Sequence, residues 1–311
     1  MSANSLVPIF FMVAAVPLAA IGGDLFLKGV LGIAAWSRVP RVLVGTTLAA
    51  FATSSPELTL STVAALSGQP EIGLGDALGS NVVNIALILG LSLLFGALPA
   101  SLRGLRREYL MAAAAPVATL ALCLDGTVSR LDGAILLVLF FVWLSLSIRH
   151  GLEFRRGAGT ETQDGVVLLP ALARGAIGLA ILILAGKLFV DGASGVAAAL
   201  GLHAYVVGAT IVAIGTSMPE LVATLLTRLR GQHDLSLGIL LGSSLFNGLA
   251  IVGIASGIQP IHAPRAEVAA ALLFGLAALL LVVPRRDVIP RGRSLLLLAL
   301  YASYAIVMAS V

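Results

Sequence analysis

The feature that most constrains this chain is a polar motif that occurs twice within apolar sequence. Its two copies, at 45–61 and 208–224, read GTTLAAFATSSPELTLS and GATIVAIGTSMPELVAT. Their equivalent residues lie 208 − 45 = 163 positions apart, and the same offset pairs Asn84 with Asn247 further along the chain. Because the matching residues include Thr, Ser, Pro, Glu and Asn, they indicate an internal duplication rather than a chance similarity of apolar sequence.

Composition places this duplication in a membrane. Hydrophobic residues make up 59% of the 311 residues and charged residues only 11%, whereas about a quarter of a soluble domain is charged. The sequence therefore predicts an all-α membrane protein with ten transmembrane helices. Apolar runs separated by proline, glycine and charge predict these spans at 6–35, 41–66, 71–97, 108–124, 131–149, 170–200, 204–228, 234–257, 266–283 and 294–310.

The ten spans divide into two repeats of five. We expect a first repeat at 1–149 with its motif at 45–84, a polar cytoplasmic linker at 150–169, and a second repeat at 170–311 with its motif at 208–247. Because five is an odd number, the second repeat enters the membrane from the opposite side. Such inverted repeats are typical of secondary transporters, whose binding site lies near the midplane where the repeats meet.

Basic residues predict the orientation of the chain. Arginines cluster in every second connection between the predicted spans, whereas the connections in between hold only Arg130 and Arg265. By the positive-inside rule, the basic connections are cytoplasmic and both termini lie outside. These charges are spread along the membrane edges, which argues against a nucleic-acid partner. The basic connections contain Arg38, Arg41, Arg103, Arg106, Arg107, Arg149, Arg155, Arg156, Arg228, Arg230, Arg285, Arg286, Arg291 and Arg293.

Each motif contains a proline that should break its helix. Pro56 and Pro219 have no backbone N–H and clash with the preceding turn. We therefore expect free carbonyl groups around 49–53 and 212–216. In a bilayer such carbonyls need partners, and a bound cation is one.

Ser54 and Glu57 lie three residues apart, as do Ser217 and Glu220, so each pair occupies nearly one helix face. Hydroxyl, carboxylate and carbonyl oxygens are hard ligands that suit Ca²⁺ or Na⁺. One Ca²⁺ between the two glutamates would be electrically neutral. The sequence therefore predicts a cation site shared by the two repeats.

A second pair of blocks, at 73–84 and 236–247, reads GLGDALGSNVVN and SLGILLGSSLFN. The glycines allow close helix contact. Ser80 and Asn84 lie four residues apart on one helix face of the first block, and Ser243 and Asn247 do so in the second. Two interpretations stay open for these side chains: neutral cation ligands, or hydrogen-bonding residues that hold neighbouring helices together.

These four blocks resemble the two alpha-repeats of the cation/Ca²⁺ antiporter superfamily, specifically the prokaryotic Na⁺/Ca²⁺ exchangers. The resemblance implies that the first and sixth helices slide across a core of the others, with alternating access for Ca²⁺ and Na⁺. By position, it implies Glu57 and Glu220 as central Ca²⁺ ligands. The further cation ligands that it implies are Ala50, Thr53, Ser54, Ser80, Asn84, Ala213, Thr216, Ser217, Ser243 and Asn247.

The chain also departs from the family pattern. Many members have Asp where this chain has Asn247, and Asn where it has Asp76 and Ile239. The loss of that carboxylate leaves Na⁺ coupling and stoichiometry open. Asp76 is either a replacement charge or, as we expect, a water-exposed residue near the outer end of its span.

Charged pairs also occur in the first and sixth spans. Asp24 and Lys28 lie four residues apart, and Lys187 and Asp191 occupy the equivalent positions with the signs exchanged. Neutralisation within each helix is one interpretation. The other is that the two helices pair with each other in one of the access states.

The predicted function is a Ca²⁺ antiporter that is driven by Na⁺ and is not an enzyme. H⁺ is an alternative coupling ion, and Mn²⁺ or Mg²⁺ an alternative substrate. An intramembrane hydrolase with Ser54 or Ser217 as nucleophile lacks a nearby base, and a channel suits paired carboxylates in broken helices less well. We expect a monomer in the inner or cell membrane of a prokaryote, with no cofactor. The single cysteine, Cys123, excludes an intrachain disulfide and a cysteine metal cluster.

Overall fold

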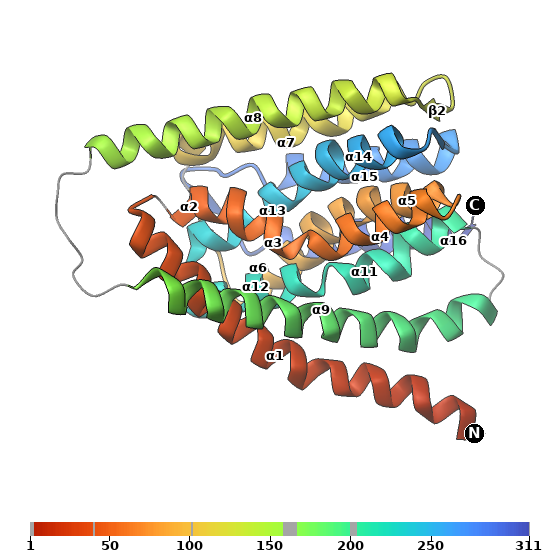
Figure 1. Cartoon of the computed structure of the whole chain (residues 1–311), viewed down its shortest axis with the longest axis horizontal. Helices are drawn as coiled ribbons and strands as arrows, with labels where there is room; N and C mark the ends of the chain where they lie inside the picture. Colours follow the sequence, from red (N-terminus) through yellow and green to blue (C-terminus); the bar gives the residue numbers. More distant parts are fainter. Residues whose placement is uncertain (1–2, 40, 101, 158–166, 200–203, 311) are drawn as a thin grey trace.

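The computed structural model is a bundle of helices that run roughly along one direction (Figure 1). It describes residues 3–39, 41–100, 102–157, 167–199 and 204–310. Residues 158–166 of the predicted linker lie outside the described residues. The preceding helix continues to Gly157, well into the predicted linker, and the next one begins at Leu168.

The first half of the chain contains α1 (Ala3–Ser37), α2 (Arg41–Val44), η1 (Gly45–Ala49), α3 (Ala50–Thr53), α4 (Ser55–Leu66), α5 (Pro70–Val82), η2 (Val83–Ile88), α6 (Leu89–Leu94), β1 (Leu98–Pro99), α7 (Leu102–Leu122), β2 (Thr127–Val128) and α8 (Arg130–Gly157). The segments named η are π-helical.

The second half contains α9 (Leu168–Ala199), α10 (Ala204–Val207), η3 (Gly208–Val212), α11 (Ala213–Thr216), α12 (Met218–Leu229), α13 (His233–Leu245), η4 (Phe246–Ile251), α14 (Val252–Ile258), β3 (Ile261–His262), α15 (Arg265–Leu281), β4 (Val288–Ile289) and α16 (Arg293–Ser310).

The π-helical segments repeat with the offset found in the sequence. The η1 segment starts at Gly45 and η3 at Gly208, while η2 starts at Val83 and η4 at Phe246, and both intervals are 163 residues. Because π-helices are rare and often occur at functional sites, their duplication supports a repeated architecture. It also suggests that functional residues lie in or next to these four segments.

The predicted helix breaks are present at both prolines. The backbone leaves the helical region at Ser54 and Ser217, and Pro56 and Pro219 lie in the first turn of the following helices. A proline is tolerated there because an N–H at that position has no partner within the helix. The segments before and after Ser217 are bent by 50°.

Six described helices are long and apolar enough to cross a membrane, or seven if the bent pair in the second repeat is one span. The count of ten therefore remains a prediction. The two numbers differ in part because the expected spans 41–66 and 204–228 consist of short helices joined at breaks. In addition, α15 is a continuous helix of only 17 residues.

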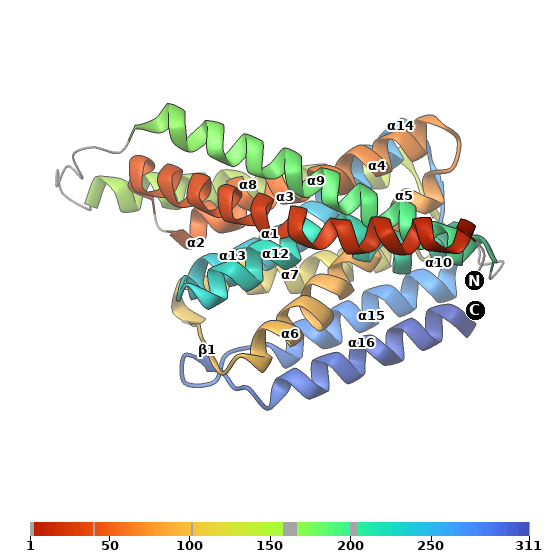
Figure 2. The ribbon, with the colours of Figure 1, turned by 90° about the horizontal axis from the view of Figure 1, so that it is seen from below.

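The bundle has a buried centre and a lipid-facing edge. Of the most apolar 18-residue stretch in the span His233–Ile258, 94% is buried inside the protein. The corresponding share for Arg130–Glu153 is 28%. The α1 and α9 helices lie side by side at the edge of the bundle, as both views show (Figures 1 and 2). They pack on α12 and, through α9, on α11.

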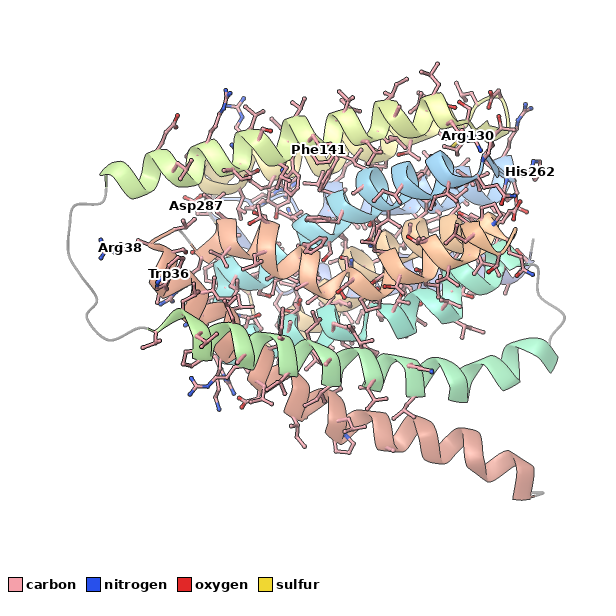
Figure 3. All side chains as sticks on the ribbon, viewed as in Figure 1. Trp36, Arg38, Arg130, Phe141, His262 and Asp287 are labelled. Atoms are coloured by element: carbon pink, nitrogen blue, oxygen red, sulfur yellow. The ribbon has the colours of Figure 1, made fainter. Side chains whose placement is uncertain are left out.

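Two short antiparallel sheets join the halves. The β1 strand pairs with β4, and β2 pairs with β3, so each sheet has one strand from each repeat. Figure 3 places Arg38 and Asp287 at one end of the bundle, and Arg130 and His262 at the opposite end. The start of α1 and the end of α16 share the end that holds Arg130 (Figures 1 and 3).

Candidate cation site

The residues expected to bind cations are all buried, and Thr216, the most accessible of them, is only 6% exposed. Two glycines bring their helices together. A Cβ atom added at Gly79 would overlap the carbonyl oxygen of Ala209, and one at Gly242 would overlap that of Thr46. These two contacts are equivalent under the repeat. They place α5 directly against η3, and α13 directly against η1.

The two glutamates are linked across the repeats. The hydroxyl group of Ser54 donates to Glu220 Oε1 at 3.0 Å, and that of Ser217 donates to Glu57 Oε1 at 3.3 Å. Each serine–glutamate pair of the sequence motif therefore faces the pair of the other repeat. This arrangement needs both halves of the chain.

The surrounding hydroxyl groups are less symmetrical. Ser243 Oγ also donates to Glu220 Oε1 at 3.0 Å and lies 3.4 Å from Thr53 Oγ1. Its repeat equivalent, Ser80, instead donates to the carbonyl oxygen of Ala213 at 3.5 Å. Glu220 thus accepts bonds from hydroxyl groups of α13 and of the first broken helix.

Several oxygens of the site have no protein partner. Glu57 Oε2 and Glu220 Oε2 are buried without a hydrogen bond, as are both amide atoms of Asn84 and of Asn247. Buried polar atoms are nearly always bonded, so such atoms need an explanation. Among the described residues, neither asparagine bonds a neighbouring helix, which favours the ligand interpretation over the packing one. A cation would satisfy the free oxygens.

The expectation that Asp76 is exposed to water is wrong. Its side chain is fully buried, and Thr216 Oγ1 donates to Asp76 Oδ1 at 2.8 Å, while Asp76 Oδ2 has no partner. The α5 helix is covered by η3, α10 and α15 along this stretch. A usable signal was present in the sequence, because Asp76, Ser80 and Asn84 follow one another at intervals of four residues on one helix face.

No group of three or more His, Cys, Asp or Glu side chains is arranged to hold a metal in the part of the chain that the structure describes. A cation here would therefore bind a mixed set of carboxylate, hydroxyl, amide and carbonyl oxygens. That set fits Ca²⁺ or Na⁺, which accept neutral oxygen ligands.

An open cleft reaches the site from one side. It has a volume of about 700 Å³ and lies between α4, α5, α9, α11 and α12. Thr216 and Pro219 form part of its wall, while Ser67 and Gln69 lie where α4 meets α5. Because Thr216 also bonds Asp76, a single hydrogen bond separates the wall of the cleft from one of the buried carboxylates.

The equivalent region of the other repeat is closed. A Cβ atom at Gly23 would overlap the side chain of Val222, so α1 packs directly on α12. Asp24 forms an ion pair with Arg230 at the end of α12. The repeat equivalents of this pair are Lys187 and Ser67, and both line the open cleft. Among the described residues, the site therefore has an open cleft on the side of α9 and close packing on the equivalent side of α1.

Asp24 also pairs with Lys28 within α1, with Asp24 Oδ2 and Lys28 Nζ 2.7 Å apart. Intrahelical neutralisation is thus confirmed for the first helix. The side chain of Asp191 lies outside the described residues, so its predicted pairing remains a prediction.

Duplicated broken helices around buried carboxylates are typical of secondary transporters. The family model described as sodium/calcium exchanger protein matches residues 7–149 and 171–309. The chain belongs to this family. It is an integral membrane protein with prokaryotic relatives.

Individual relatives agree with this assignment. The inner membrane protein YrbG of Escherichia coli is 32% identical over 230 residues, which are 71% of each chain. The sodium/calcium exchanger MaX1 of Methanosarcina acetivorans is 23% identical and covers 92% of this chain and 94% of its own. A solved structure of the sodium-calcium exchanger NCX_Mj matches with a TM-score of 0.81, at 29% identity, over 99% of both chains.

Proposed function

We propose that this protein exchanges Ca²⁺ for Na⁺ by alternating access to the site between Glu57 and Glu220. The observation that carries the proposal is the reciprocal bonding of the two serine–glutamate pairs, which leaves one oxygen of each glutamate free. A Ca²⁺ ion between them would be neutralised in a region where an unpaired charge is costly. Thr53, Ser54, Thr216 and Ser217 would add hydroxyl or carbonyl oxygens.

Alternating access follows from the one-sided cleft. The duplicated fold offers two equivalent arrangements, one with α9 away from α4 and the other with α1 away from α12. We infer that movement of α1 and α9 along the rest of the bundle converts one arrangement into the other. The ion would then be released on the opposite side without a continuous pore.

The second part of the proposal is the identity of the ion that drives Ca²⁺ exchange. Na⁺ is favoured by the neutral oxygen ligands and by the relatives MaX1 and NCX_Mj, whose names describe sodium/calcium exchange. H⁺ is the second candidate, because buried carboxylates also carry protons.

Uptake of ⁴⁵Ca²⁺ into Na⁺-loaded proteoliposomes tests the proposal. Wild type is expected to take up Ca²⁺ only with an outward Na⁺ gradient, while Glu57→Gln and Glu220→Gln should lose at least nine-tenths of the rate. Glu267→Gln, at the start of α15 and away from the site, is the control. Wild-type uptake driven by a pH gradient alone would replace Na⁺ with H⁺, and unchanged uptake in both Gln variants would exclude this site.

A further inference from the structure

The buried carboxylate of Asp76 has no repeat equivalent. The corresponding residue of the second repeat is Ile239, which is 1% exposed and packs in an apolar cluster. The symmetry that relates the two glutamates is therefore broken by one charge. This charge lies beside the wall of the open cleft, because its partner Thr216 lines that cleft.

No fixed cation balances this charge. Among the described residues, Asp24 and Glu108 form ion pairs, whereas Asp76 forms none. Glu57, Asp76 and Glu220 are near enough to interact electrostatically, and one Ca²⁺ balances two of their three negative charges. Since an uncompensated buried charge is strongly unfavourable, the third carboxylate needs a monovalent cation of its own.

The oxygens around Asp76 suit such an ion. Asp76 Oδ2 is buried without a partner, and Thr216 Oγ1 lies 2.8 Å from Asp76 Oδ1. Ser80 lies one helical turn further along α5 and contacts the carbonyl oxygen of Ala213. These are hard oxygen ligands from two helices, of the kind that bind Na⁺.

We propose that Asp76 binds one Na⁺ ion that is carried in each transport cycle in addition to the ions held by Glu57 and Glu220. This inference rests on the proposed exchange function. It assigns to the first repeat a coupling residue that the second repeat lacks, and it makes the number of monovalent ions per Ca²⁺ depend on a single side chain.

The decisive measurement is the membrane potential at which net Ca²⁺ flux stops in proteoliposomes with fixed ion gradients. This null potential reports the number of monovalent ions exchanged per Ca²⁺ rather than the rate. Asp76→Asn keeps the shape of the side chain and an acceptor for Thr216, and it is expected to exchange one monovalent ion fewer per Ca²⁺. Asp234→Asn, an exposed position in the first turn of α13, should match wild type.

Two ion gradients separate the sources of the monovalent charge. If the ion is Na⁺, the difference between Asp76→Asn and wild type follows the Na⁺ gradient. A difference that instead follows the pH gradient at fixed Na⁺ would overturn the assignment of Na⁺ to Asp76. Identical null potentials for both proteins under both gradients would overturn the proposal.

If Asp76→Asn does not transport Ca²⁺, ion binding is measured in place of transport. The melting temperature of the purified full-length protein is followed against Na⁺, with choline as the inert replacement, and against pH. Asp76→Asn, and separately Thr216→Val, should shift the Na⁺ midpoint at least tenfold. An unshifted Na⁺ midpoint, or a shift in the pH midpoint alone, would overturn the inference. Absence of Ca²⁺ exchange in wild type would instead overturn the proposed function, while the melting curves would still report on Asp76.

Discussion

Single hydroxyl groups orient the two glutamates of the site. Ser54 and Ser217 each donate to the glutamate of the opposite repeat, and a hydrogen bond to a charged group contributes about 1.5–3 kcal/mol. We therefore expect Ser54→Ala and Ser217→Ala each to raise the Ca²⁺ concentration for half-maximal uptake by about tenfold or more.

Ser55→Ala is the matched control for this prediction. Ser55 is adjacent in the chain but donates only to the carbonyl oxygen of Ala52, so its Ca²⁺ dependence should stay within about twofold of wild type. Equal effects of all three substitutions would mean that the hydroxyl groups act on helix stability and not on the glutamates.

The sequence was informative at this scale where a charge was duplicated. The burial of Glu57 and Glu220 at one shared site was predictable from the sequence. A carboxylate inside apolar sequence is unfavourable, and this one occurs twice with the same neighbours. Asp76 shares a helix face with Ser80 and Asn84, but it was misplaced because this spacing alone does not show whether that end of the helix faces water. That distinction depends on what packs around α5, which only the fold reveals.

At the scale of helices, two glycines control the closest contacts of the site. Gly79→Ala and Gly242→Ala would force α5 away from η3 and α13 away from η1. Overpacking of this kind costs about 1–3 kcal/mol. Both variants should therefore melt at a lower temperature than wild type in detergent, as followed by circular dichroism.

Gly257→Ala serves as the control, since a Cβ atom there meets no atom within 4 Å. Alanine also favours helix more than glycine does, so this variant should melt at or above the wild-type temperature. Wild-type melting of the Gly79 and Gly242 variants would show that these helices can move apart at no cost.

The open cleft gives a second prediction for the helices. Ala64 lines the cleft, whereas its repeat equivalent, Thr227, is fully buried. In a Cys123→Ala background, Ala64→Cys should react with a membrane-impermeant maleimide at least tenfold faster than Thr227→Cys when the reagent is applied on both sides. Equal labelling rates would contradict a structure open to one side.

The helix breaks could be predicted from sequence, but the π-helical segments could not. Pro56 and Pro219 mark the breaks because proline has a local stereochemical effect. A π-helical turn has no comparable residue signal. It forms where packing requires an extra residue in the turn, so the η segments depend on neighbouring helices that lie far away in the chain.

For the whole molecule, the positive-inside rule predicts both termini outside. A C-terminal fusion should therefore give active alkaline phosphatase and non-fluorescent green fluorescent protein in a bacterial host. The same reporters fused after Gly157, at the end of α8, should behave in the opposite way. Fluorescence of the C-terminal fusion would reverse the orientation and assign the open cleft to the cytoplasmic side.

The Asp24–Arg230 ion pair affects the balance of the entire transport cycle. Two identical inverted halves would rest equally in both orientations, because exchanging the halves exchanges the states. Here the closed side has an ion pair, whereas the equivalent positions on the open side, Lys187 and Ser67, cannot form one. An exposed pair contributes up to about 1 kcal/mol, a population ratio of about fivefold. We therefore expect the proposed exchange cycle to have a preferred resting orientation, with forward and return half-cycles that run at unequal rates.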